Sequence, residues 1–569
     1  MTRAPAPAAI VLLYALLAAG VCAPALVYPA GRALGHADAD TFNHVWGYWQ
    51  VFQALAAGRS PLTTELLGYP SGGALYFIDL FGAIRTLPVQ WAFGPVVAYN
   101  VACWSNLWLT GVGAHLLAAR VSGSSWAAFV AGVGLAASPH LLGQAGNGIS
   151  ETLALGFLPL FVWAALGLRA APSRARAALT GVMLGLCGLA NWYYGLFAGL
   201  VGLMFVAESL GRGPRPAALR PVLPWALAPA ALLVLPALWA FRATMNTDAA
   251  LVARDADFVL ASLIGHNVVD TLSFFTPGDH HSPDLLKLYD ERLRAVVYLG
   301  WVSMALAALG AMSGAGDRRG WVALVVVSWL LALGPFLYIG GDHALLPGSV
   351  FVPLPFYALW ASLPLISTIS HAYRFVVLTQ LALGVLAACA LARRPRLAPA
   401  LGPLAALAVL IDGALLSPAD WPVPFARADV PAVYAQIEGE GAVIDLPVSL
   451  QSLAQGRYAL YQTQHGRPIP YALNNPTPPI LDARRLTRLI IDLERSAVLS
   501  PPPTLPTLDL LVSRDLLVSE GFVAIVLHPS LYPPAMGQKV RVTLDRALGA
   551  GVEVDGAVLY ALSPSPAAP

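Results

Sequence analysis

Long apolar runs separated by short polar segments dominate the first 416 residues of this 569-residue chain. A membrane-spanning helix needs about 20 mostly apolar residues. We predict one span in each of eleven such runs, at residues 8–28, 96–119, 127–142, 152–168, 177–190, 194–207, 222–241, 296–312, 321–339, 375–392 and 397–416. The pattern therefore predicts an α-helical, polytopic membrane domain over residues 1–416.

Length distinguishes between alternative interpretations of two apolar stretches. Residues 8–28 are longer than the 7–15 apolar residues of a typical signal-peptide core, so we expect an uncleaved anchor. Residues 177–207 could form one helix, but at about 1.5 Å per residue it would far exceed a hydrocarbon core of about 30 Å. We therefore predict two helices separated by Asn191-Trp192-Tyr193-Tyr194.

Arginines in the short connections support this count, because Lys and Arg accumulate on the cytoplasmic side of a membrane. With the N-terminus inside, every second connection is basic, through Arg120, Arg169, Arg174, Arg176, Arg212, Arg215, Arg220, Arg318, Arg319, Arg393, Arg394 and Arg396. The short connections at 143–151 and 191–193 contain no Lys or Arg. This topology places three polar segments, 29–95, 242–294 and 340–373, together with the C-terminus, on the outer face.

Residues 417–569 have the pattern of a soluble domain. Residues 441–447 and 521–528 read as strands, and residues 480–495 read as an amphipathic helix. Residues 552–558 predict a β-hairpin whose turn is Asp555-Gly556. We predict an external α/β domain in this part of the chain.

Composition narrows the possible functions. Only 11% of the residues are charged, against roughly 25% in an average soluble domain. The net charge of +2 gives no large basic face, so nucleic acid is excluded as a partner. All four cysteines lie in apolar runs, where neither a disulfide framework nor a Cys-based zinc site is expected.

The segment after the first run contains a candidate for chemistry. Val45, Trp49, Phe52 and Ala56 recur at helical spacing, which predicts a helix lying in the membrane interface and beginning at Asp40 or Thr41. Asp40 and His44 are four residues apart and would share a face of this helix. Asp40 is either a solvated N-cap or a functional carboxylate, and the spacing does not decide between them.

Several short motifs together carry a resemblance. They are Asp40-Thr-x-x-His44-x-Trp46-x-x-Trp49, Thr64-Glu-Leu-Leu-Gly-Tyr69-Pro70-x-Gly72, Ala98-Tyr99-Asn100, Ser138-Pro139-His140, Ile369-Ser-His-Ala-Tyr-Arg374-Phe375, Ile444-Asp445-Leu446-Pro447 and Tyr461-Gln-Thr-Gln-His465-Gly466-Arg467-Pro468. With this pattern the chain resembles the GT-C superfamily of integral-membrane glycosyltransferases, in particular a bacterial branch related to protein mannosyltransferases and the lipid A aminoarabinose transferase. The likeness covers nearly the whole chain.

The resemblance implies transfer of a sugar from a polyprenyl-phosphate donor to a glycan, lipid or protein acceptor. The reaction would take place at the outer face of a bacterial cytoplasmic membrane. Asp40 would act as general base or metal ligand, with Asp38 and His44 beside it. Glu151 matches a second acid of several relatives, and it could equally be a charge that favours the following helix dipole. If the reaction uses a divalent metal such as Mg²⁺ or Mn²⁺, Asp40 and Glu151 would hold it.

A phosphate leaving group also needs a cation. Arg374, beside His371 and Tyr373, could bind it bidentately, or it could instead anchor to lipid headgroups. We expect the donor groove between residues 351–360, an apolar stretch broken by prolines, and the helix of Asp40. Further candidates for substrate binding are His140, Asn147, Trp192 and Tyr193, although the two aromatic residues suit a membrane-interface belt as well.

Two other functions fit an apolar chain of this kind. A transporter or flippase of lipid-linked sugars would have charges buried at mid-membrane and broken helices in repeated halves, and neither feature is evident in the sequence. A non-catalytic membrane scaffold would use the external domain to bind a partner, and Asp40 would then be dispensable. We expect an enzyme.

Overall fold

The computed structural model describes the chain except residues 1–3, 76–77, 211–218, 246–255, 279–292, 313–317, 365, 452, 473–477, 496–506 and 563–569. Arg212 and Arg215 of the predicted basic loops lie outside the described residues. The chain divides into two compact units. Unit 1 comprises Met1–His36, Asp79–Ala240 and Arg254–Ala426, and unit 2 comprises Ala37–Ile78, Phe241–Ala253 and Arg427–Pro569. Each unit is described by itself.

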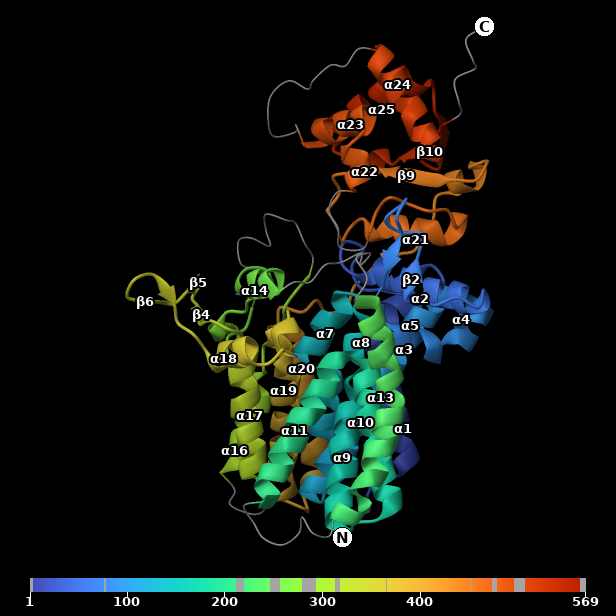
Figure 1. Ribbon diagram of the computed structural model, residues 1–569. Helices are drawn as coiled ribbons and strands as arrows, with labels where there is room; N and C mark the ends of the chain where they lie inside the picture. The colour runs from blue at the N-terminus through green and yellow to red at the C-terminus, as the bar shows by residue number, and fades with distance from the viewer. Residues whose placement is uncertain are drawn as a thin grey trace. The chain divides into compact units, whose positions relative to one another are not determined.

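Unit 1 is a bundle of apolar helices (Figure 1). Each of the eleven predicted runs contains helix. The helices are α1 (Pro7–Leu26), α5 (Pro95–Ser122), α6 (Phe129–Ala136), α7 (Pro139–Gly146), α8 (Ser150–Leu153), α9 (Phe157–Ala170), α10 (Arg174–Ala190), α11 (Trp192–Leu210), α13 (Leu223–Met245), α16 (Trp301–Ala311), α17 (Arg319–Ala332), α19 (Val376–Ala392) and α20 (Ala398–Leu416). Shorter elements around them are α3 (Leu80–Arg85), α4 (Leu87–Phe93), α14 (Ala256–Ile264) and α18 (Pro355–Ser362).

Several helices are long and apolar enough to cross a membrane. Among the described residues these are Pro7–Leu26, Ser150–Ala170, Arg220–Ala243, Ala372–Ala392 and Ala398–Leu416. The chain is therefore a multi-pass membrane protein, and the count of eleven spans stays a prediction. The predicted break in residues 177–207 is confirmed, because α10 ends at Ala190, Asn191 is extended and α11 begins at Trp192.

Three runs are shorter as helices than the apolar pattern suggested. The run at 127–142 is interrupted at Ser138, which caps α7 by accepting a hydrogen bond from Leu141 N at 3.3 Å. In the run at 296–312 the helix begins only at Trp301. The run at 321–339 is helical only to Ala332, since Gly334 takes a positive φ of 79°. Hydrophobicity alone does not distinguish such extended, buried segments from helix.

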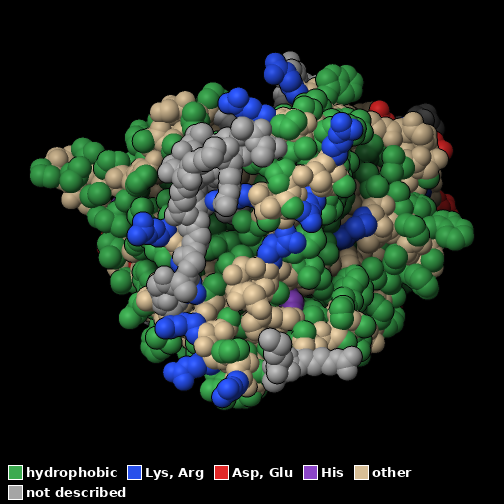
Figure 2. Space-filling model, turned by 90° about the horizontal axis from the view of Figure 1, so that it is seen from below, with side chains coloured by type: hydrophobic (Ala, Val, Ile, Leu, Met, Phe, Trp, Pro, Cys, Tyr) green, Lys and Arg blue, Asp and Glu red, His purple; other side chains and the backbone are tan. Residues whose placement is uncertain are grey.

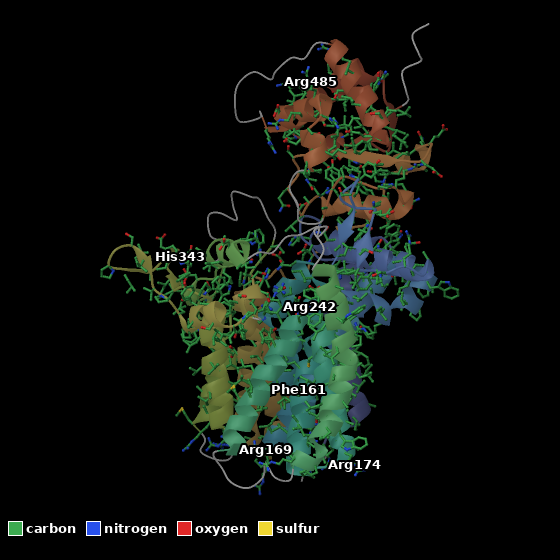
Figure 3. The ribbon with its side chains drawn as sticks, in the orientation of Figure 1. Phe161, Arg169, Arg174, Arg242, His343 and Arg485 are labelled. Carbon is green, nitrogen blue, oxygen red and sulfur yellow. The ribbon has the colours of Figure 1, made fainter. Side chains whose placement is uncertain are left out.

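Arginines gather at one end of the bundle. Figure 2 shows this face, with many blue side chains over the helix ends, and Figure 3 labels Arg169 and Arg174 there. Arg120, at the end of α5, donates to the Trp163 carbonyl at 2.9 Å and stacks over the Trp163 ring at 4.5 Å. The distribution is the one that the loop charges predicted for a cytoplasmic face.

Glycines bring two helices of the bundle unusually close. A Cβ placed on Gly181 of α10 would lie 1.9 Å from the Ala226 carbonyl oxygen of α13, and one on Gly185 would lie 2.7 Å from Leu233. Spacing of small residues by four is typical of close helix contacts in membranes. Most other side chains of α13 are partly or fully exposed, including Trp225, Leu232 and Trp239.

Unit 2 contains the predicted α/β domain. Its sheet has the order β11-β12-β10-β9, formed by β9 (Ala442–Leu446), β10 (Phe522–Leu527), β11 (Val552–Val554) and β12 (Ala557–Ala561). Strand β10 pairs parallel with β9 and antiparallel with β12. The predicted hairpin is confirmed, with Asp555 and Gly556 both at positive φ in its turn. Helices α22 (Pro479–Asp482) and α23 (Arg485–Arg495) cover the predicted amphipathic segment, and α24 (Thr507–Ser519) and α25 (Pro534–Leu548) complete the domain.

The first predicted outer segment is divided between the two units. Its helix α2 (Thr41–Ala56) belongs to unit 2 and packs against α21 (Gly456–His465), whereas α3 and α4 belong to unit 1. The polar positions of α2 are not exposed, since Asn43 and Gln50 are buried as well as Val45, and its place in the membrane interface stays a prediction. The polar side chains opposite the apolar stripe find partners within unit 2, and amphipathic spacing cannot reveal such partners.

Candidate functional site

A buried guanidinium stands at the centre of the candidate site in unit 1. Arg374 lies in the short 3₁₀ turn Ala372–Phe375 that leads into α19, and only 8% of its surface is exposed. The guanidinium carbon lies 4.9 Å from the centre of the Tyr193 ring, in a cation–π contact. The buried Nε atom of Arg374 makes no hydrogen bond with any described residue. A buried donor without a partner is costly, so this atom is suited to binding an anion.

Helix α11 and the turn before it position Tyr193. The Asn191 side chain accepts a hydrogen bond from Tyr193 N at 2.9 Å, which fixes the break between α10 and α11. The Tyr193 hydroxyl in turn accepts from His371 N at 3.2 Å. The predicted residues Tyr193, His371 and Arg374 are therefore brought together by two helix starts that are distant in the sequence.

Glu151 supplies a negative charge to the same cluster. It lies in α8 and interacts electrostatically with Arg374. Tyr194, the residue after Tyr193, lies near both charges and donates its hydroxyl to the Thr152 carbonyl. A role for Glu151 in the reaction stays a prediction.

Histidines and Tyr373 form one wall of the cluster. The Tyr373 ring meets His140 edge to face at 6.0 Å and His371 at 5.7 Å. His140 is buried, and its Nδ1 lies 3.0 Å from the Val296 carbonyl oxygen. The Ser370 hydroxyl lies 2.8 Å from Nδ1 of His371. The structure therefore places His140 and His371 against Tyr373, the residue that precedes Arg374 in the chain.

Two of the predicted substrate-binding residues have other surroundings. Asn147 exchanges two hydrogen bonds with the Arg294 backbone, at 3.0 Å and 2.9 Å, so its amide is engaged in holding that segment. Trp192 is 40% exposed at the start of α11. This exposure fits the belt aromatic that the sequence allowed.

A buried polar network behind Glu151 was not foreseen. Asp79 caps α3 through Gly82 N at 2.8 Å and accepts from the Ser150 hydroxyl at 2.6 Å. Asn106 donates to the Ser150 carbonyl at 3.0 Å and accepts from Arg85 at 2.6 Å. The network fixes the start of α8, the helix of Glu151. An aspartate before a helix signals a cap in the sequence, but nothing there announces its distant partner.

The predicted catalytic residues belong to unit 2. Asp38 forms a salt bridge with Arg457 at 2.5 Å. Asp40 occupies the N-cap position of α2, yet its side chain makes no capping hydrogen bond and instead accepts from the Asn43 amide at 3.2 Å. His44 is buried, and its backbone N donates to the Asp40 carbonyl at 3.0 Å. Asp38, Asp40 and His44 thus belong to unit 2, whereas the other predicted site residues belong to unit 1.

A metal ion at Asp40 and Glu151 stays a prediction. The described residues contain no group of three or more His, Cys, Asp or Glu side chains that could hold a metal ion. Glu151 lies beside a guanidinium, which competes with a dication for the carboxylate. The residues present therefore fit a metal poorly at Glu151.

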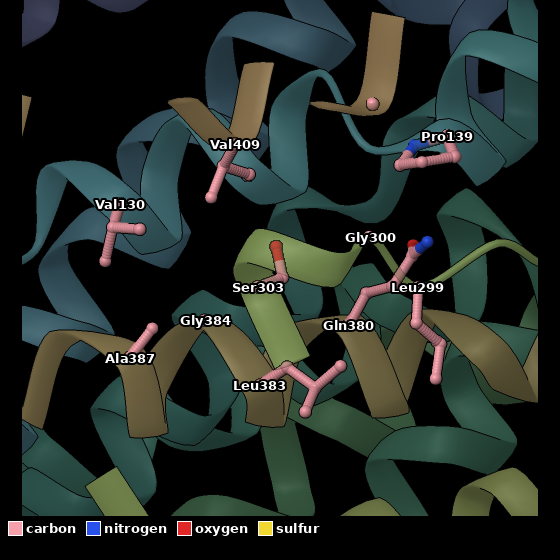
Figure 4. Close-up of a pocket in the computed structure, with 12 residues that line it drawn as sticks. Val130, Pro139, Leu299, Gly300, Ser303, Gln380, Leu383, Gly384, Ala387 and Val409 are labelled. Carbon is pink, nitrogen blue, oxygen red and sulfur yellow. The ribbon is translucent and has the colours of Figure 1, made fainter. Parts of the chain in front are cut away.

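A small hollow inside the bundle provides a contrast to this cluster. Figure 4 shows it between α6, α16, α19 and α20, and the twelve residues that line it include no charged side chain. Gln380 extends into it, donating to the Tyr298 carbonyl at 3.2 Å. Asp412, a neighbouring buried acid, accepts from the Tyr298 hydroxyl and from Val302 N, each at 2.9 Å, and so caps α16. The hollow lacks the cationic side chain that a phosphate site needs.

No family model and no curated protein matches the chain. Among solved structures, it resembles the arabinofuranosyltransferase AftD from Mycobacteria with a TM-score of 0.57 and 15% identity, over 100% of this chain and 42% of that chain. It resembles the oligosaccharyltransferase of Archaeoglobus fulgidus with a TM-score of 0.51 and 13% identity, over 91% of this chain and 69% of that chain. The chain has the GT-C fold.

The GT-C fold agrees with the resemblance carried by the sequence motifs. The chain spans less than half the length of AftD, and the identities are low, so the comparison concerns the fold. Any statement about the site therefore rests on this chain's own residues, in particular the cluster around Arg374.

Proposed function

We propose that this GT-C protein is a glycosyltransferase that moves a sugar from a polyprenyl-phosphate donor to an acceptor hydroxyl at the outer face of a bacterial cytoplasmic membrane. The observation that carries the proposal is the buried Arg374 guanidinium, whose Nε has no hydrogen-bond partner in the part of the chain that the structure describes. Guanidinium is the side chain that best matches phosphate oxygens. An apolar bundle is also the natural place for a polyprenyl chain.

The surroundings of Arg374 suit a lipid phosphate rather than a soluble one. Next to it, Phe375 packs against Phe197 at 4.6 Å and against Phe356 of α18 at 6.3 Å. Phe356 belongs to the apolar stretch 351–360 that we expect to form one wall of the donor groove. Aromatic walls beside a cation provide an apolar surface for the chain and a charge for the head.

The reaction requires three events. The acceptor oxygen forms a bond to the anomeric carbon of the sugar, the bond from that carbon to the phosphate oxygen breaks, and the hydroxyl proton passes to a base. Arg374 would stabilise the negative charge that builds up on the leaving phosphate. The base is a carboxylate, for which Asp40 is the match by resemblance and Glu151 is the acid held beside Arg374.

Binding of a polyprenyl phosphate to the purified protein tests the proposal. Arg374→Ala should weaken binding by roughly 10- to 150-fold, which corresponds to the loss of a charged hydrogen bond of about 1.5–3 kcal/mol. Arg374→Lys should restore only part, because Lys keeps the charge and lacks the fork. Arg120→Ala is the matched control, since Arg120 also stacks on an aromatic ring but lies outside the cluster.

A thermal unfolding curve for each variant separates lost binding from lost folding. If both Arg374 variants fold and bind with unchanged affinity, the phosphate site lies elsewhere. Arg242, labelled in Figure 3, and Arg294 are the next candidates. Of these, Arg294 already lies 3.5 Å from Asp420 and donates to the Pro418 carbonyl, so Arg242 would be examined first.

A further inference from the structure

Two small antiparallel hairpins follow α17 in unit 1. The first pairs β4 (Tyr338–Ile339) with β5 (Asp342–His343), and the second pairs β6 (Leu345–Leu346) with β7 (Val350–Phe351). Their common base is closed where Leu354 N donates to the Pro335 carbonyl at 2.8 Å. We refer to residues 336–353 as the double hairpin.

The base of the double hairpin lies close to the end of a membrane helix. Tyr338 is six residues after Ala332, where α17 ends, so the first strand begins at most about 20 Å from that end. Figure 1 shows the hairpins projecting sideways from the end of the bundle, beside α18. The face of α17 with Val322, Val326 and Val327 is exposed, as expected for a helix in contact with lipid. The double hairpin therefore follows directly on a helix with an exposed apolar face.

The exposed surface of the double hairpin is apolar. Leu345 and Val350 are each 57% exposed, Leu346 is 46% exposed and Ile339 is 42% exposed. Between residues 333 and 364 the sequence contains one residue charged at neutral pH, Asp342. A water-facing loop with so many bare aliphatic side chains and so little charge is unusual.

One side of the double hairpin is fastened to the protein. Gly341 N donates to the Asp270 carboxylate at 2.8 Å, and the Thr271 hydroxyl donates to the Tyr338 carbonyl at 2.9 Å. A ring nitrogen of His343 lies 2.9 Å from the Ile264 carbonyl oxygen. These contacts hold the first hairpin in place, while the aliphatic residues of the second stay exposed.

We propose that the second hairpin inserts into the headgroup region of the bilayer leaflet at which α17 ends. The bilayer is the occupant that the observations favour, because the hairpin follows a helix with an exposed apolar face and carries aliphatic side chains without the charges that a polar partner would require. The aromatic pair Tyr357 and Trp360, stacked at 6.2 Å on the adjacent α18, has the composition of a membrane-interface belt. The function is to fix the height and tilt of this edge of the bundle against the membrane surface.

Spin labels on single introduced cysteines in the full-length protein test this proposal in liposomes of phosphatidylcholine. Leu346→Cys and Val350→Cys report on the second hairpin, and Asp342→Cys reports on the fastened turn of the first. Gln464→Cys, on the exposed surface of α21, is the aqueous control. The wild-type protein measures background labelling of the four native cysteines, which are all buried.

We expect labels at positions 346 and 350 to collide more with oxygen and less with a water-soluble nickel chelate than labels at 342 and 464. An aqueous collision ratio at 346 and 350, equal to that at 464, would overturn the proposal. Immobile labels shielded from both reagents, or broadened by a second label nearby, would also overturn it, because they would show a protein partner or a second copy. A thermal unfolding curve for each variant confirms that the labelled protein is folded.

Discussion

Replacing Gln462 by leucine tests whether α2 and the C-terminal domain are held together as one unit. Gln462 of α21 is completely buried and makes three hydrogen bonds to distant or turn positions. Its Oε1 accepts from the Trp46 ring nitrogen of α2 at 2.6 Å. Its Nε2 donates to the carbonyls of Leu66 and Arg467, at 2.6 Å and 2.7 Å. Leucine has nearly the same size and can make none of these bonds.

The expected loss follows from what remains buried after the change. The Trp46 ring is also fully buried, so its N–H loses its partner without gaining water. Leaving a buried donor unpaired costs about 1–3 kcal/mol, and the two carbonyls add less because both residues are only partly buried. We expect opening of unit 2 to become easier by about 2–4 kcal/mol, which is a factor of roughly 30 to 1,000 in the opening equilibrium.

Hydrogen–deuterium exchange of the full-length protein in detergent measures this equilibrium locally. Amides of α2 and α21 should exchange faster in Gln462→Leu by the factor above, while amides of α19 should keep their rates. Gln464→Leu is the matched control, because Gln464 lies two residues further along α21 and is exposed. It should leave all of these rates nearly unchanged.

Two results would refute the reasoning. Equal exchange in Gln462→Leu and Gln464→Leu would mean that the buried amide does not hold α2 to the C-terminal domain. Faster exchange in α21 with no change in α2 would mean that α2 is held by other contacts, of which the close approach of Gly456 to Asn43 is the first to examine.

Three further predictions concern Asp40, the topology and pH. Asp40→Asn should abolish sugar transfer in complemented cells without loss of expression, because the Asp40 carboxylate makes no capping hydrogen bond. Asp38→Asn should mainly weaken the salt bridge to Arg457. Wild-type transfer by Asp40→Asn would remove Asp40 from catalysis. A cysteine near Gly466 should react with an impermeant reagent in intact cells and one near Arg394 should not, and equal labelling would contradict the topology. The pKa of His465 is lowered to about 4, mainly by burial; Asp445 raises it in part and Arg467 adds a smaller lowering effect. His465 in the unfolded chain binds a proton near pH 6.5, so unit 2 should lose stability as the pH falls from about 6.5 to about 4. His465→Gln should reduce this loss, as measured by urea unfolding of unit 2 monitored by hydrogen–deuterium exchange.

Much of the fold could be predicted because its signals are local. The break at Asn191 follows from helix length against membrane thickness, and the turn at Asp555-Gly556 follows from the conformations that these two residues tolerate. The grouping of Arg374 with His371 and Tyr373 was partly visible, since the three are neighbours in the sequence. Glu151 was a candidate only because of the family resemblance, and Tyr193 only because it is an aromatic residue at a helix break. Nothing in the sequence placed either of them next to Arg374.

The remaining features depend on pairs that are distant in the sequence. The bond from Trp46 to Gln462 spans 416 residues, and the bond from Ser150 to Asp79 spans 71. A hydrophobic pattern records that a residue is buried but not which element buries it. For this reason the spacing of α2 predicts its apolar stripe, but not that Asn43 and Gln50 are buried within unit 2.

The glycines of α10 have a consequence for how the protein should be handled. Backbone lies against backbone where Gly181 meets Ala226, while much of the α13 surface is not covered by any described residue. In a bilayer, the acyl chains complete the enclosure of α13 and press it onto the glycine groove. Detergent micelles exert less lateral pressure, so α13 should be the first helix to drift during purification. Nanodiscs would then be the better preparation for measuring the properties of unit 1.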